Sequence, residues 1–303
     1  MNDSIKQMGL KEWAYLLTLS ILWGGSFFFI EVCLQSMPPI SIAGGRLILA
    51  AICLHAFRLI ARRSFPRDPK ILLRFLILGL LNNAIPFSLL IWGQTFVTGG
   101  MASLLIASTP FFTIIIAHSF TSDEKVTLIK FLGILIGLGG VAMIMGVQDA
   151  DNQLIGKLAV IVTAILYGCG GVYARTLKKY ELDPLTTATG QITFAALAMI
   201  PVIILIDRPW DLPMPTAISC TSLILMSILT TAVAYIIYFR ILASSGATNV
   251  LLVTFLNPVS ALLLGAIFLG EYISISQIMG ILIIGVGLIF IDGRILFRLR
   301  DRG

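Results

Sequence analysis

Charged residues are scarce in this chain. Asp, Glu, Lys and Arg make up 12% of its 303 residues, against about 25% in typical soluble domains. In contrast, 58% of the residues are hydrophobic and the mean hydropathy is +0.99. A soluble fold of this length would expose large apolar patches. The composition therefore excludes a soluble enzyme, a disordered chain and a coiled coil, and it leaves an integral membrane protein. The net charge of +6 then belongs at the bilayer boundary, and nucleic acid is not an expected partner.

Residues that carry chemistry are also few. The cysteines Cys33, Cys53, Cys169 and Cys220 fall in or beside apolar stretches and form no CxxC pair, so we expect neither a disulfide framework nor a metal site. The sequence shows no paired acids, no Ser–His arrangement, no HExxH motif and no Walker motif. These absences argue against an intramembrane enzyme, and we expect no cofactor and no direct use of ATP.

Ten apolar segments approach or reach the length needed to cross a bilayer, which is about 20 mostly apolar residues. They cover residues 12–31, 40–61, 71–92, 99–119, 126–147, 155–175, 185–206, 217–240, 247–269 and 274–295. With the N-terminus in the cytoplasm, 18 of the 21 Lys and Arg residues fall on the cytoplasmic side, and only Lys157 and Arg208 fall outside. This distribution predicts an even number of spans with both termini cytoplasmic.

The second half of the chain repeats the first. The segments ILWGGSFFF and ILYGCGGVY align with each other, and Pro110 aligns with Pro258. The two halves, 1–150 and 151–303, hold five predicted helices each. An odd number of helices turns the second half upside down, as in the inverted-topology repeats of many secondary transporters. We therefore expect an all-α integral membrane protein with ten transmembrane helices arranged as two inverted five-helix repeats.

The motifs of this chain resemble those of the drug/metabolite transporter superfamily, and within it the EamA-domain family. They are LWGGSFF at 22–28, GGR at 44–46, STP at 108–110, NP at 257–258 and FLGE at 268–271. The resemblance covers essentially the full chain. Similar members of this family export amino acids and other small metabolites. The resemblance therefore implies a secondary transporter, and it places that transporter in a bacterial-type inner membrane. Sugar phosphates or nucleotide sugars, the cargo of other relatives, are the alternative, but such anions usually require two or more basic side chains in the cavity.

Polar and helix-breaking residues gather at one depth of the predicted bundle, where they are costly unless they line a cavity or a packed interface. Asn82 and Asn83 lie midway along the third span, and Thr230 and Thr231 occupy the matching place in the eighth. At similar depth, we expect Thr109–Pro110 to break the fourth span and Asn257–Pro258 to break the ninth. We predict that this central slab lines the substrate path, with tight packing as the alternative role of its aromatic residues and glycines. The predicted substrate-binding residues are Trp23, Arg46, Asn82, Asn83, Tyr167, Gln191, Tyr235 and Asn257.

Arg46 is the basic residue that lies well inside a predicted span, roughly 10 Å below the outer surface. It either attracts a carboxylate or phosphate of the substrate, or pairs with Glu31, or extends to the outer headgroups. No Asp or Glu lies between the boundary residues of the ten spans. We therefore expect transport without an intramembrane proton carrier, with coupling through Glu31 or Glu271 at the rims as the alternative. The predicted gating residues are Pro110, Pro258, Glu31 and Glu271.

Glycines crowd the fifth and tenth predicted spans and form GxxxG-like faces. Such faces favour tight packing between helices of one chain or between copies of the chain. The expected partners are therefore a small-molecule substrate, membrane lipid and, in the second case, another copy of the protein.

Overall fold

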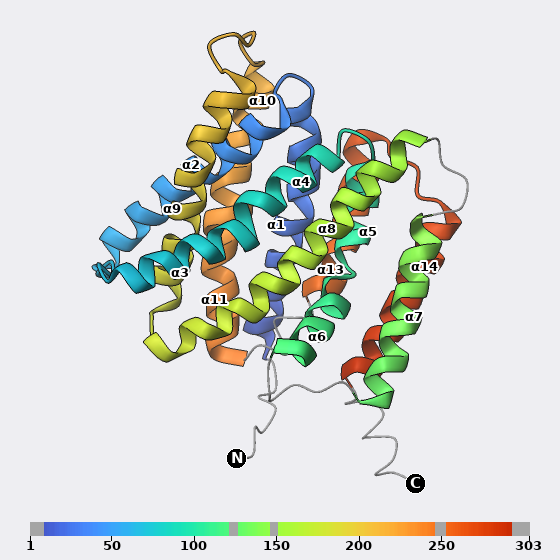
Figure 1. Ribbon diagram of the computed structural model, residues 1–303. Helices are drawn as coiled ribbons and strands as arrows, with labels where there is room; N and C mark the ends of the chain where they lie inside the picture. The colour runs from blue at the N-terminus through green and yellow to red at the C-terminus, as the bar shows by residue number, and fades with distance from the viewer. Residues whose placement is uncertain (1–8, 121–126, 146–150, 246–252, 293–303) are drawn as a thin grey trace.

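The computed structural model describes residues 9–120, 127–145, 151–245 and 253–292, and it is helical throughout its described regular elements (Figure 1). The first half contains α1 (Leu10–Leu34), α2 (Pro39–Ile60), α3 (Pro69–Gly79), η1 (Leu80–Ala84), α4 (Ile85–Gly93), α5 (Gly99–Ile106), α6 (Thr109–Phe120) and α7 (Leu128–Met145). The second half contains α8 (Asp151–Ala174), η2 (Arg175–Tyr180), α9 (Pro184–Val202), η3 (Ile203–Asp207), α10 (Ala217–Leu225), η4 (Met226–Val233), α11 (Ala234–Ser245), α13 (Val253–Leu264), η5 (Gly265–Leu269) and α14 (Ile275–Asp292).

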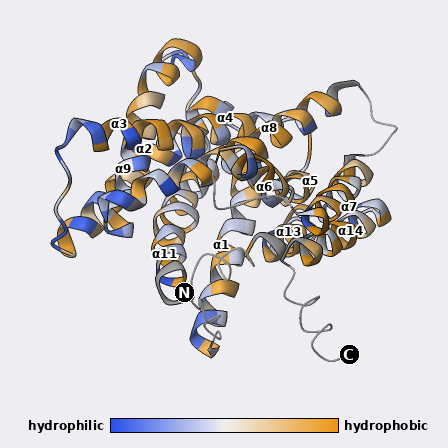
Figure 2. Cartoon of the chain, turned by 60° about the horizontal axis from the view of Figure 1, so that its bottom comes forward, coloured by the Kyte–Doolittle hydropathy of each residue, from blue (hydrophilic) through white to orange (hydrophobic). Residues whose placement is uncertain are grey.

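Within the described ranges, seven helical units are long and apolar enough to cross a membrane. Three shorter apolar helices, Leu128–Ile144, Leu256–Leu269 and Ile275–Gly287, fall on the fifth, ninth and tenth predicted segments. Figure 2 shows hydrophobic residues along most of the helices and a hydrophilic stretch in the connection between α2 and α3. The all-helical membrane protein predicted from composition is confirmed. The predicted boundary after residue 150 and the basic tail beyond residue 292 involve residues outside the described ranges.

Helix starts follow local sequence signals. Asp68 and Asp183 precede Pro69 and Pro184, and each carboxylate accepts a backbone hydrogen bond from the first turn of its helix. A capping side chain satisfies an amide that the helix leaves free, and proline fits the first helical position because it needs no hydrogen-bond acceptor. Thr98 caps α5 in the same way, accepting from Met101 N at 3.3 Å. These caps fix where the chain re-enters the bundle.

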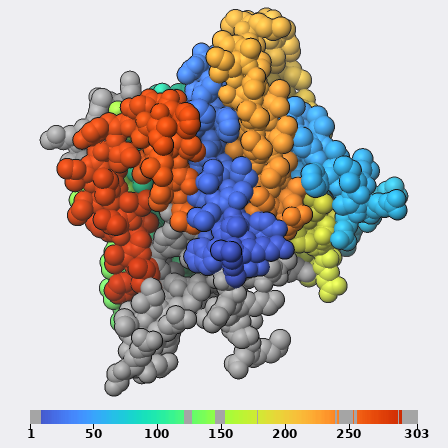
Figure 3. All heavy atoms as spheres, turned by 180° about the vertical axis from the view of Figure 1, so that it is seen from behind, coloured from blue at the N-terminus to red at the C-terminus, as the bar shows by residue number. Residues whose placement is uncertain are grey.

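Helices of the two halves are interleaved. α1 packs against α13, α10 and α11, and α8 packs in turn against α6, α5 and α4. Figure 3 shows α1, in blue, between the gold and orange of α10 and α11 and the red of the last described helices. α2 pairs with α9, and α7 pairs with α14. Each of these last two pairs joins helices that the sequence repeat aligns with one another.

Glycines allow the closest crossings between halves. A Cβ on Gly24 of α1 would lie 2.6 Å from Ser260 Cβ and 2.9 Å from the carbonyl oxygen of Asn257 on α13. A Cβ on Gly168 of α8, the aligned position, would lie 3.0 Å from the backbone nitrogen of Thr113 on α6. The packing role of these two glycines is therefore visible in the structure, and it serves equivalent crossings in the two halves.

The predicted helix break is present at Pro110 and absent at Pro258. Ala107 and Ser108 form a turn between α5 and α6, and Pro110 is the second residue of α6. In contrast, α13 continues through Pro258, so the expected break at Asn257 and Pro258 is wrong. Proline removes one backbone hydrogen bond, and neighbouring helices in a membrane protein can support the helix around it.

The glycine-rich faces of α7 and α14 meet within one chain. A Cβ on Gly140 would lie 2.7 Å from the carbonyl oxygen of Gly280, and one on Gly287 would lie 2.6 Å from that of Gly133. The structure thus uses these faces for intrachain packing. Association between copies stays a prediction.

Candidate substrate site

Two π-helical segments interrupt the α-helices at matching places in the two halves. η1 carries Asn82 and Asn83, and η4 carries Thr230 and Thr231. A π-turn inserts an extra residue per turn and frequently occurs at functional sites. Pro86 gives a local reason for η1, because its missing N–H cannot bond the carbonyl four residues earlier. The central slab predicted from polar residues therefore coincides with irregular backbone in both halves.

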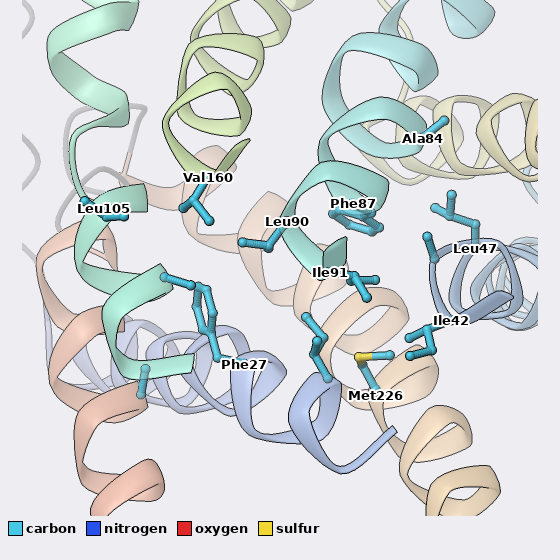
Figure 4. Close-up of a cluster of buried hydrophobic side chains, with 14 of the residues drawn as sticks. Phe27, Ile42, Leu47, Ala84, Phe87, Leu90, Ile91, Leu105, Val160 and Met226 are labelled. Atoms are coloured by element: carbon cyan, nitrogen blue, oxygen red, sulfur yellow. The ribbon is translucent and has the colours of Figure 1, made fainter. Parts of the chain in front are cut away.

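Arg46 reaches from α2 into this region and is 4% exposed. Its Nε donates to Thr231 Oγ1 at 2.9 Å, and its Nη2 donates to Thr230 Oγ1 at 3.2 Å. The guanidinium carbon lies 4.1 Å from the ring centroid of Phe87, a distance at which the aromatic face attracts a cation. Figure 4 shows Phe87 on α4 directed toward the side chains of α2. Two hydroxyl groups and one ring thus hold the guanidinium, and all three are neutral.

The alternative pairing of Arg46 with Glu31 does not occur. Among the described residues, no carboxylate forms an ion pair with Arg46; its electrostatic neighbours are Tyr167, Tyr235 and Cys33. A buried charge is costly unless it is paired and hydrogen-bonded. The site therefore contains a buried positive charge whose hydrogen-bond partners in the structure are neutral.

A second set of contacts lies beside Arg46. Asn83, which is fully buried, donates from Nδ2 to the hydroxyl oxygen of Tyr235 at 3.1 Å. Gln191 of α9, which is 3% exposed, lies close enough to Tyr235 to influence its hydroxyl. Asn83 Oδ1 is buried without a hydrogen-bond partner. The cluster thus joins η1, α9 and α11, and it retains one unused acceptor.

Aromatic side chains extend the cluster toward α1. The ring centroids of Tyr235 and Tyr238 are 6.5 Å apart, and those of Tyr238 and Trp23 are 5.7 Å apart. Tyr167 of α8 is close enough to interact electrostatically with Arg46. Of the predicted binding residues, Arg46, Asn83, Tyr167, Gln191 and Tyr235 therefore come together, with Trp23 linked through Tyr238. We call the first five, together with Thr230 and Thr231, the central cluster.

Asn82 and Asn257 lie apart from these contacts. The Oδ1 atom of Asn82 would be 3.0 Å from a Cβ on Gly170, so this side chain packs on α8. Asn257 lies at the crossing of α13 with Gly24, and its Oδ1 is buried without a hydrogen-bond partner. Neighbouring positions on one helix face different partners because successive helical residues point about 100° apart.

Most of the central cluster is buried: Arg46, Asn83, Gln191, Thr230 and Thr231 are inaccessible or nearly so, while Tyr167 and Tyr235 are partly exposed. Two apolar hollows lie near it: one between α2 and α9, beside His55 and Thr193, and one between α1, η4 and α13, where Thr230 of the cluster forms part of the wall. Thr230, which lines the second hollow, is one of the two threonines that bind Arg46.

The hydroxyl partners of Arg46 and the ring of Phe87 were missing from the predicted site. Thr230 and Thr231 were recognised as polar residues at the right depth, but nothing in the sequence connects them with Arg46. Phe87 carries no signal of its own, because it lies among other apolar residues of the third span. The signal in the sequence that assigns Thr230 and Thr231 to the site is the repeat, because it aligns them with Asn82 and Asn83.

The predicted gating carboxylates lie together at one end of the bundle. We call the end with the first turn of α1 and the last turn of α14 the terminal end, and the opposite end the distal end (Figure 1). At the distal end, Glu31 Oε2 accepts from Gly99 N at 3.0 Å and Glu271 Oε2 accepts from Gly100 N at 3.1 Å. Both carboxylates thus contact the start of α5, while Pro110 and Pro258 lie deeper in the bundle.

Relatives with this sequence pattern are named as transporters. The uncharacterized transporter YoaV of Bacillus subtilis is 26% identical over 280 residues, which cover 90% of this chain and 94% of the relative. The uncharacterized inner membrane transporter YedA of Escherichia coli K12 is 27% identical over 286 residues, covering 93% and 91%. A protein of the same strain named as a probable amino-acid metabolite efflux pump is 26% identical over 296 residues, covering 93% and 94%.

A solved structure and a family match extend over nearly the whole chain. The solved structure, described only as the crystal structure of a protein, has a TM-score of 0.69 and 17% identity and covers 95% of this chain and 99% of the other. It shows that the fold is shared. The EamA-like transporter family matches residues 11–146 and 154–292. The resemblance seen in the sequence motifs is thereby confirmed: this chain belongs to the EamA-like transporter family.

Proposed function

We propose that the chain is a secondary transporter that exports small organic metabolites bearing a carboxylate, with amino acids and their derivatives as the leading class. The observation that carries this proposal is Arg46, a buried guanidinium held by Thr230, Thr231 and the ring of Phe87. A substrate carboxylate supplies the negative charge that the described partners of Arg46 do not. Arg–carboxylate pairs are strong and directional because two N–H groups can bind the two oxygens.

The remaining groups of the central cluster suit the rest of such a substrate. Asn83 Oδ1 is a buried acceptor without a partner, and it can receive a hydrogen bond from an ammonium or hydroxyl group. Tyr167, Tyr238 and Trp23 provide aromatic surface for an apolar or cationic part. The name of the efflux pump relative points to the same substrate class.

Sugar phosphates or nucleotide sugars are less well matched to these residues. A phosphate with two negative charges is usually held by more than one cation. The second buried cation of the described residues, Lys157, is 2% exposed. It follows Gly156, whose Cβ would meet Phe96 beyond the end of α4, and so it lies on the distal side rather than in the central cluster.

We further propose alternating access between two inverted five-helix halves, 1–150 and 151–303. The interleaved helix pairs support this arrangement, since α1 with α13 and α8 with α6 form equivalent crossings at Gly24 and Gly168. One half rocks against the other and exposes the central cluster to either side in turn. In this proposal Pro110 and Pro258 act as gates, and both termini face the cytoplasm of a bacterial inner membrane.

The test is counterflow in liposomes that contain the purified protein. Labelled amino acids, nucleosides and sugar phosphates are offered in parallel to the wild type and to Arg46→Gln. We expect uptake of a carboxylate-bearing solute, reduced at least about tenfold in Arg46→Gln, because a charge-assisted bond contributes about 1.5–3 kcal/mol. Arg58→Gln, which removes a cation near the end of α2, is the matched control and should retain uptake.

The solute series separates the two substrate classes. An amide or ester of the best carboxylate substrate should be taken up poorly by the wild type and should respond little to Arg46→Gln. Uptake of sugar phosphates with no uptake of carboxylates would favour the alternative class. Equal carboxylate uptake by wild type and Arg46→Gln would remove the assigned role of Arg46.

A further inference from the structure

Glu31 and Glu271 come from different halves and meet at the start of one helix. Glu31 lies near the end of α1, and Glu271 follows η5. They accept hydrogen bonds from the backbone amides of Gly99 at 3.0 Å and Gly100 at 3.1 Å, and because these two amides are consecutive in the first turn of α5, the two carboxyl groups lie close together. A hydrogen bond between two carboxyl groups needs a proton on one of them, because an ionised carboxylate can only accept.

Acceptors outnumber donors around this pair. Glu271 Oε1 is buried and has no hydrogen-bond partner. Gln94, which is 6% exposed, uses its Nε2 to donate to the carbonyl oxygen of Phe27 at 3.1 Å, and its Oε1 is also buried without a partner. Gln94 Nε2 and Glu31 Oε2 both lie within 3.3 Å of a Cβ built on Gly99. Buried acceptors are rarely left without a donor, and a proton on the pair supplies one.

No described cation neutralises the two carboxylates. The charged group that acts on Glu31 is Glu271. Lys157 of α8, a helix packed against α5, is buried, and it is not among the groups that act on Glu31. Lys130 lies in the first turn of α7, and His118 lies in the last turn of α6, both far from the start of α5. The amides of Gly99 and Gly100, at the positive end of a helix dipole, give partial compensation, but two ionised carboxylates in contact still repel each other.

We propose that Glu31 and Glu271 share one proton while the distal end is closed, and that release of this proton opens that end. In the closed form, one carboxyl donates its O–H to the carboxylate of the other. Loss of the proton to water leaves two negative charges in contact, and α1 then separates from the segment that follows η5. Binding of this proton is thereby coupled to the relative position of the two halves.

This inference rests on the proposed transporter function only for the biological role of the gate. Its tests need no substrate. The first test is infrared spectroscopy of the full-length protein in lipid at neutral pH, comparing wild type with Glu31→Gln/Glu271→Gln. We expect the wild type to show a carbonyl band of a protonated carboxylic acid that the double variant lacks. Asp207→Asn is the matched control. Asp207 is a single carboxylate that accepts from both the backbone nitrogen and the hydroxyl of Ser41, each at 2.7 Å, so its removal should leave the band unchanged.

The second test measures opening of the distal end. Ser103, one turn below Gly100 on α5 and 1% exposed, is replaced by cysteine after the four native cysteines are changed to alanine. Its reaction rate with a charged thiol reagent is compared at mildly acidic and mildly alkaline pH, with and without Glu31→Gln. The glutamine amide can donate permanently to Glu271, so the variant should stay closed. The parent here carries Ser103→Cys alone, and the variant carries Glu31→Gln in addition. We expect the ratio of their reaction rates, parent over variant, to rise about tenfold from mildly acidic to mildly alkaline pH.

Glu271→Gln serves as a second variant, and both single variants are checked for a single folded species by size exclusion. Absence of a carboxylic acid band that the double variant removes would overturn the shared proton. A rate ratio that stays constant with pH in both single variants would overturn the gating role. If both tests succeed while no solute is taken up by the wild type, the proton-linked gate stands and the proposed transport function fails.

Discussion

Asn83 donates a hydrogen bond to the hydroxyl of Tyr235, 3.1 Å away, and thereby joins the π-helical segment η1 of the first half to α11 of the second. The two residues are 152 positions apart in sequence. In the proposed alternating access the two halves move relative to each other, so under that proposal a bond between them at the central cluster would tie substrate binding to their relative position.

Removal of this bond should affect transport more than folding. In Tyr235→Phe the ring stays and the hydroxyl is lost, and Asn83 then has a second unsatisfied group. We expect the half-saturating substrate concentration to rise about five- to tenfold, since a hydrogen bond contributes about 1 kcal/mol. Counterflow in liposomes measures it. Tyr272→Phe, at a position 86% exposed, is the control, and an unchanged concentration dependence in Tyr235→Phe would contradict the assignment.

The sequence predicted the helices better than it predicted their contacts. Apolar length located most of the described helices within a few residues, because a helix that crosses a bilayer must be apolar over its length. Contacts such as Arg46 with Thr231 depend on how each helix is rotated, and helices that are apolar on all sides give little periodic signal for rotation. The pairing of Glu31 with Glu271 was missed for a related reason: both were placed at the rim, but only the tertiary fold brings α1 and the end of η5 to the start of α5. Pro258 shows that a local signal can be overridden, since α13 continues through it.

The hydroxyl of Thr231 should be needed to keep Arg46 in place. Thr231→Val preserves the shape of the side chain but removes the acceptor of Arg46 Nε. We expect the protein to lose about 1–3 kcal/mol of stability, the range for an unsatisfied buried polar group, and to lose most of the thermal stabilisation given by a carboxylate substrate. Thermal unfolding in detergent, with and without the substrate, measures both.

Two further variants separate the loss of the hydrogen bond to Arg46 from a general loss of stability. Thr231→Ser restores the hydroxyl and should recover stability and ligand response. Thr221→Val removes an exposed hydroxyl that bonds to the carbonyl oxygen of Ala217 and should change little. Equal losses in Thr231→Val and Thr221→Val would mean that the bond to Arg46 is not the cause.

Gly24 should tolerate no side chain. In Gly24→Ala the new Cβ would lie 2.6 Å from Ser260 Cβ and 2.9 Å from backbone atoms of α13, so the two helices must move apart. Overpacking of this kind costs about 1–3 kcal/mol. Gly139→Ala is the matched control, because a Cβ there meets nothing within 4 Å and alanine favours the helix. A lowered unfolding temperature for Gly24→Ala and an equal or higher one for Gly139→Ala are expected; the reverse order would place the tight crossing elsewhere.

The two ends of the bundle should face opposite sides of the membrane, with the terminal end in the cytoplasm. Basic residues at Arg62, Arg63 and Arg67 follow α2, whereas Lys157 lies in the second turn of α8 and Arg208 follows η3 at the opposite end. Such an asymmetry orients membrane proteins during insertion, because positively charged connections are retained inside. Reporter proteins fused after Arg67 and after Arg302, the latter outside the described residues, should both give a cytoplasmic signal. A fusion after Asp151, at the start of α8, should give an external signal. A cytoplasmic signal at Asp151 would show that one of the first five spans does not cross, and it would remove the inverted relation between the halves on which alternating access depends.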